Sequence, residues 1–101
     1  MSRLQDAHRR INDELAQERA GALGRAGERL EAALAHATSL GRRLDTTRDP
    51  DEHARLLGEY EGARMRAVHA RLALVIQREA LGLRQHRIVD QQFREPPRRS
   101  R

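Results

Sequence analysis

The sequence predicts an all-α protein in which two long antiparallel helices form a coiled-coil-like hairpin. Ala, Arg, Leu and Glu make up 57 of the 101 residues, a composition typical of long helices. A strong helix-start signal near the middle of the chain divides it into two helical halves. The chain has no Cys and no Trp, with one Tyr and one Phe, so it lacks the aromatic residues of a deep enzyme pocket. We therefore expect a single non-enzymatic domain without disulfides or thiolate metal sites.

The first helix is expected from about residue 3 to residue 45. Ser2, with Gln5 three residues later, has the pattern of a capping box, in which each side chain binds the backbone N–H of the other residue. Apolar positions then recur about every eleven residues, a period that predicts an almost straight helix. They are Leu4, Ile11, Leu15, Ala22, Ala26, Leu30, Ala33, Ala37 and Leu44. Three glycines within Gly21–Gly27 leave open a break there, because each interior glycine costs about 1 kcal/mol relative to alanine.

The second helix is expected from about residue 50 to residue 93, after a turn over residues 46–49. Asp49 is a favourable N-cap, Pro50 suits the first helical position, and Glu52 can complete a capping box. This helix has two apolar stripes on different faces. One stripe consists of Leu57, Tyr60, Val68, Leu72, Val75 and Leu83. The other consists of Leu56, Ala63, Ala67, Ala70, Leu74, Leu81 and Ile88.

The short turn sets an expected register for the hairpin, in which residue i lies opposite roughly residue 95 − i. This register brings Arg64 near Glu31 and Arg78 near Glu18, so opposite charges face each other along the flank. It also brings His8 near His86. Residues 1–93 would then form the hairpin domain.

The second apolar stripe of the second helix carries the functional prediction, because the first helix can cover only one face of it. An exposed apolar strip has no use in a monomer, and two hairpins that pack through it would form a four-helix-bundle homodimer. The predicted interface residues are Leu72, Leu74, Val75, Leu81 and Ile88. We therefore predict a protein–protein interaction module, such as a scaffold, adaptor or assembly factor. The same strip could receive a helix of another protein.

Residues 94–101 are expected to form a flexible Arg/Pro tail, because Pro96 and Pro97 end the helix. The basic residues there and before it give the alternative hypothesis of an Arg-rich, nucleic-acid-associated protein. Its candidate contacts are Arg84, Arg87, Arg94, Arg98, Arg99 and Arg101. We favour the alternative that the arginines of the second helix pair with acidic residues of the first, since aromatic residues for base stacking are lacking.

Other sites and locations have little support in the sequence. His8, His86 and Asp90 are the candidate metal ligands, but Cys ligands and Glu-x-x-His pairs are absent, and we predict no metal, cofactor or small-molecule substrate. The longest apolar run, Leu72–Ile76, is far too short to span a membrane, so we expect a cytoplasmic protein. In size alone the hairpin is similar to secretion chaperones and to stalk components of export apparatuses, which gives a third hypothesis.

Overall fold

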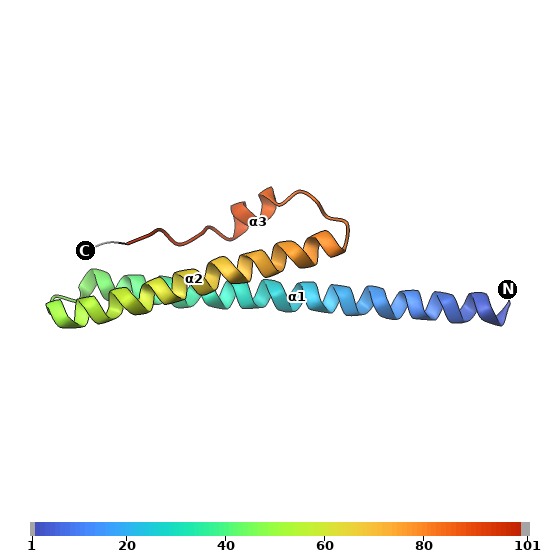
Figure 1. The fold of residues 1–101 in the computed structure, drawn as a ribbon, viewed down its shortest axis with the longest axis horizontal. Helices are drawn as coiled ribbons and strands as arrows, with labels where there is room; N and C mark the ends of the chain where they lie inside the picture. The colour runs from blue at the N-terminus through green and yellow to red at the C-terminus, as the bar shows by residue number, and fades with distance from the viewer. Residues whose placement is uncertain (1, 100–101) are drawn as a thin grey trace.

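The computed structural model describes residues 2–99, which form three helices and no strands. Helix α1 spans Arg3–Thr46, α2 spans Pro50–Ala80 and α3 spans Arg87–Gln92. Helices α1 and α2 form an antiparallel hairpin, and α3 with the segment after it runs back over α2 toward the turn (Figure 1). The molecule is a rod of 72 × 21 × 14 Å. The predicted all-α helical hairpin is confirmed.

Helix α1 begins at the predicted capping box and runs without a break. The Ser2 hydroxyl accepts from the Gln5 backbone N–H at 3.2 Å, and the Gln5 side chain accepts from the Ser2 N–H at 3.2 Å. Its 44 residues give a length of about 66 Å. The alternative with a break over Gly21–Gly27 is wrong, because the helix continues through all three glycines.

Helix α2 begins as predicted at Asp49 and Pro50. The Asp49 carboxylate accepts from the Glu52 backbone N–H at 2.9 Å, and Pro50 occupies the start of the helix. The reciprocal half of the predicted capping box is not formed. The Glu52 carboxylate instead accepts from Nε of Arg55 at 2.9 Å, a charge-assisted bond that is stronger than one to a neutral backbone amide.

Helix α2 ends at Ala80, so the prediction of one helix to residue 93 is wrong. Gly82 has φ of +83°, a left-handed conformation that ends a helix and that glycine adopts without steric cost. Its N–H donates to the carbonyl of Glu79 at 2.9 Å, and the N–H of Leu83 donates to the carbonyl of Arg78 at 3.0 Å. This pair of bonds is a Schellman motif. The chain then reverses and forms α3.

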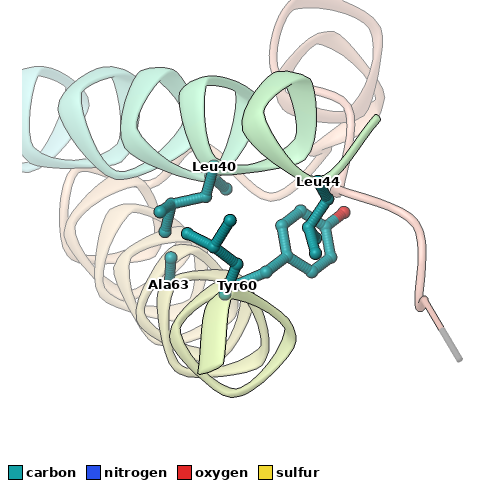
Figure 2. Packing of buried hydrophobic residues seen from close by; sticks show 6 residues of the cluster. Leu40, Leu44, Tyr60 and Ala63 are labelled. Atoms are coloured by element: carbon teal, nitrogen blue, oxygen red, sulfur yellow. The ribbon is translucent and has the colours of Figure 1, made fainter. Parts of the chain in front are cut away.

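The larger core cluster lies in the turn half of the hairpin. Leu40 and Leu44 of α1 point toward Tyr60 and Ala63 of α2, as Figure 2 shows. Ala37 and Leu56 complete this cluster, and all six side chains are buried. The turn half is therefore closed by the two helices together.

A second core cluster lies nearer the open end of the hairpin and includes the C-terminal part of the chain. Ala26 and Leu30 of α1 and Leu74 of α2 are buried together with Val89 of α3. Phe93 packs against the cluster from the residues just after α3. The C-terminal segment therefore forms part of the core.

The buried residues show a register shifted by about five residues from the expected one. In the larger cluster, residues 37, 40 and 44 of α1 pack with residues 56, 60 and 63 of α2, so residue i of α1 lies opposite roughly residue 100 − i of α2. The end of α2 at Ala80 thus reaches α1 at about residue 20. Residues 3–19 of α1, which we call the N-terminal arm, extend beyond α2 (Figure 1).

Candidate interaction surface

The predicted interface residues do not share one exposed face. Leu74 is only 5% exposed and lies in the core of the hairpin, so its assignment to an outer interface is wrong. Leu72 is 56% exposed, Leu81 and Ile88 are also exposed, and Val75 is half-buried. The physical reason is that α1 packs on the stripe that contains Leu74, whereas the prediction assigned this stripe to a partner.

Exposed apolar side chains on α2 form a different stripe from the predicted one. Met65, Leu72 and Ile76 are spaced by seven and four residues, which places them on one face of the helix. Leu83 and Ile88, in the loop after α2 and in α3, are exposed as well. We call this group, together with Leu81, the α2-end patch.

The N-terminal arm carries the other exposed apolar group. Leu4, Ile11 and Leu15 are 65%, 53% and 42% exposed, respectively. The expected register places them against the second helix, but α2 ends at Ala80 before it reaches them. The signal that was missed is Gly82, a glycine that can end a helix within an otherwise continuous helical pattern.

Three arginines on one face of α2 hold the C-terminal part of the chain, residues 85–99, which we call the return segment. Arg78 donates to the carbonyl of Gln85 at 2.8 Å, and Arg71 donates to the Asp90 carboxylate at 2.6 and 2.9 Å. Arg64 donates to the Glu95 carboxylate at 3.4 Å. Arg64, Arg71 and Arg78 recur every seven residues, so their side chains leave the helix in similar directions. The arginines expected to pair with α1 therefore bind the return segment.

Arg64 is the buried member of these three. Its guanidinium also donates to the Glu61 carboxylate at 2.6 and 3.0 Å. This hydrogen bond lowers the pKa of Glu61 and raises the pKa of Arg64. The charge of Arg64 is thus balanced by Glu61 and Glu95, as a buried charge requires.

The end of the return segment docks near the turn of the hairpin. The Tyr60 hydroxyl donates to the carbonyl of Pro97 at 2.6 Å. The guanidinium of Arg99 donates to the Asp45 carboxylate at 2.7 Å, and its central carbon lies 5.2 Å from the centre of the Tyr60 ring. Gly41 permits this approach, because a Cβ there would lie 2.9 Å from an Arg99 nitrogen. The hydrogen bond from Arg99 lowers the pKa of Asp45.

These contacts correct the prediction of a flexible tail over residues 94–101 as far as residue 99, and residues 100 and 101 lie outside the described part of the chain. Residues 94–99 pack along the hairpin through hydrogen bonds, ion pairs and one cation–π contact. The prediction of a flexible tail rests only on the helix-breaking effect of the prolines. Prolines end a helix, but the extended chain that follows still offers free carbonyls and charged side chains to neighbouring helices.

Of the candidate nucleic-acid contacts, some arginines are exposed and one forms an ion pair within the protein. Arg84, Arg87, Arg94 and Arg98 are exposed, whereas Arg99 is paired with Asp45. Arg101 lies outside the described residues. The basic surface is therefore smaller than the sequence suggests, since carboxylates of the return segment pair with Arg64 and Arg71 of α2.

The candidate metal ligands do not come together. Over residues 2–99, no group of three or more His, Asp or Glu side chains is placed to hold a metal ion. Asp90 is bound by Arg71, and the His86 ring lies between Arg78 and Glu79, at 3.3 and 3.2 Å. His8 lies on the exposed N-terminal arm.

The two apolar groups are thus the main features that the fold leaves without an internal partner. The N-terminal arm extends beyond the end of α2 (Figure 1), and the α2-end patch apart from Met65 lies between residue 72 of α2 and residue 88 of α3. Within the described part of the chain, no helix is long and apolar enough to cross a membrane. Comparison with known protein families, curated proteins and solved structures finds no match for this chain.

Proposed function

We propose that this protein is a non-enzymatic protein–protein interaction module that acts as a scaffold, adaptor or assembly factor. The observation that carries the proposal is the contrast between the two ends of the rod. Leu40, Leu44, Leu56 and Tyr60 close the turn half, whereas the large exposed aliphatic side chains gather toward the open end. These are Leu4, Ile11, Leu15, Leu72, Ile76, Leu81, Leu83 and Ile88.

The spacing of these side chains suits helix-mediated recognition. Leu4, Ile11 and Leu15 follow steps of seven and four residues, as do Met65, Leu72 and Ile76. Such steps place apolar anchors along one helix face, the pattern by which amphipathic helices bind helices or grooves. Contiguous exposed apolar surface on a small protein marks an interaction site.

Native mass spectrometry of the full chain, isolated gently from its own cells, tests the proposal. We expect masses of two or more chains of 11.6 kDa each, or masses with an added polypeptide. The double variant Ile11→Gln with Leu15→Gln should reduce these species, whereas Ala20→Gln, on the opposite face of α1, should not. A mass of one bare chain for the wild type over the whole micromolar range would contradict the proposal.

A second candidate function, association with nucleic acid, is favoured by the exposed Arg84, Arg87, Arg94 and Arg98. In the same experiment it predicts added mass that nuclease removes. Replacement of these four arginines by Gln should then abolish the added mass, because phosphate contacts dominate such binding.

A further inference from the structure

The apolar face of the N-terminal arm continues the face of α1 that already packs against α2. Projected at about 100° per residue, the apolar residues of the arm and those of the hairpin core fall within one arc of about 100°. The arm contributes Leu4, Ile11 and Leu15, and the core contributes Ala26, Leu30, Ala37 and Leu44. The same stripe is therefore covered by α2 over one part of α1 and uncovered over residues 3–19.

We propose that the N-terminal arm pairs in an antiparallel arrangement with the arm of a second copy of this chain. The partner arm would lie along α1 where α2 leaves off, and it would run in the same direction as α2. The proposal rests on the proposed function and names the partner of the arm surface.

The length of the uncovered stretch is the first argument for a second copy. A helix that covers residues 3–19 must be of the same length and must approach from the open end of the hairpin. The arm of a second copy meets both conditions, because it is the same segment and it projects freely from its own hairpin (Figure 1). A two-fold axis at the centre of the arms then covers both arms at once.

The order of the residues is the second argument. When residue i of one arm lies opposite about residue 19 − i of the other, the apolar positions face each other within residues 3–19. Leu4 meets Leu15 at each end, and Ile11 meets His8 near the centre. Each pairing occurs twice because of the symmetry.

The charge of the arm is the third argument. Residues 3–19 contain four arginines and four acidic residues, so the arm has no net charge apart from histidine. They are Arg3, Arg9, Arg10, Arg19, Asp6, Asp13, Glu14 and Glu18. Because each arm has no net charge, two arms do not repel each other electrostatically. A strongly acidic or basic partner would have no net electrostatic attraction to this surface.

Cysteine cross-linking tests both the partner and the direction, since the natural chain has no cysteine. Full-length Leu4→Cys and Leu15→Cys proteins are mixed, equilibrated in a glutathione redox buffer and analysed by intact mass. We expect mixed dimers of the two variants, and little dimer from either variant alone. His8→Cys and Ile11→Cys should also cross-link when they are mixed. Ala20→Cys, on the opposite face, is the control and should form no cross-linked dimer.

Sedimentation equilibrium provides an independent measurement of the affinity. The double variant Ile11→Asp with Leu15→Asp should weaken self-association at least about 100-fold, because four charged groups would be buried in each dimer. Ala20→Asp should leave it unchanged. The arm is outside the core of the hairpin, so circular dichroism should show that all of these variants stay helical.

Two results would overturn the inference. Cross-linking of each single variant with itself, but not in mixtures, would show parallel arms. Absence of any cross-link, together with a monomeric mass at all concentrations, would exclude the second copy. In that last case the proposed function would still stand if the native protein carried a different polypeptide through the arm or the α2-end patch.

Discussion

The most direct test of the fold is the pair Leu74→Ala and Leu72→Ala. Both positions are leucines in α2, two residues apart, so the change in helix propensity is the same at each. Leu74 is 5% exposed and Leu72 is 56% exposed. Any difference between the two variants therefore reports burial within the hairpin.

The expected magnitude at Leu74 follows from its surroundings. Replacement of a buried leucine by alanine costs about 2–5 kcal/mol, depending on how far the neighbours can close the cavity. Leu74 contacts a cluster only one layer deep, bordered by the half-buried Leu23, Leu34 and Phe93. Partial collapse is possible there, and we expect the lower part of the range, about 2–3 kcal/mol. For Leu72→Ala we expect less than about 0.5 kcal/mol.

The assay is urea unfolding followed by circular dichroism at 222 nm, repeated at several protein concentrations. Concentration dependence separates the stability of the hairpin from that of any oligomer. Equal losses of unfolding free energy in the two variants would refute the reasoning, because the face with Leu72 would then be as buried as the face with Leu74. A larger loss at Leu72 would show that α1 packs on the other stripe.

Three further predictions use the same unfolding assay or the only tyrosine. Gly82→Ala should destabilise by about 1–2 kcal/mol because its φ is +83°, whereas Gly24→Ala, in a helix with free space around it, should stabilise by about 0.5–1 kcal/mol. Equal effects would contradict the assigned helix end. Tyr60→Phe should cost about 0.5–1.5 kcal/mol through loss of its hydrogen bond to the return segment, and no loss would argue against that docking. Arg99 lowers the pKa of Asp45, so this contact stabilises the docked segment above about pH 4 and is lost as the pH falls below that value. The fluorescence of Tyr60, which lies beside Arg99, should therefore change below about pH 4 in the natural protein but not in the Asp45→Asn variant.

The return segment changes how the arginine content of this chain is understood. Arg64, Arg71 and Arg78 look like a basic helix face in the sequence, and they suggested either phosphate binding or pairing with the first helix. In the structure they bind a carbonyl and two carboxylates of residues 85–99. A seven-residue spacing of arginines predicts a shared direction, but it does not identify the partner.

The helix starts could be predicted, and one helix end could not. Ser2 and Asp49 cap the helices through groups that lie three residues away in the chain, so a few residues suffice to identify them. The end at Ala80 also has a local signal in Gly82, but the helical pattern that continues to Ile88 predicted a longer helix. The position at which α2 ends depends on Val89 and Phe93, because these residues can pack in the second core cluster only when the chain reverses after α2.

The sequence by itself determined that the chain is helical, where each long helix begins, and that one side of α2 would remain apolar and uncovered. These properties depend on composition, caps and periodicity, which act over a few residues. Only the tertiary structure decided that α1 covers Leu74 and leaves Leu72 exposed. Two stripes of similar hydrophobicity do not differ locally, and the choice between them depends on the joint packing of α1, α2 and the return segment. The uncovered arm is a consequence of that packing, because α1 remains long where α2 stops.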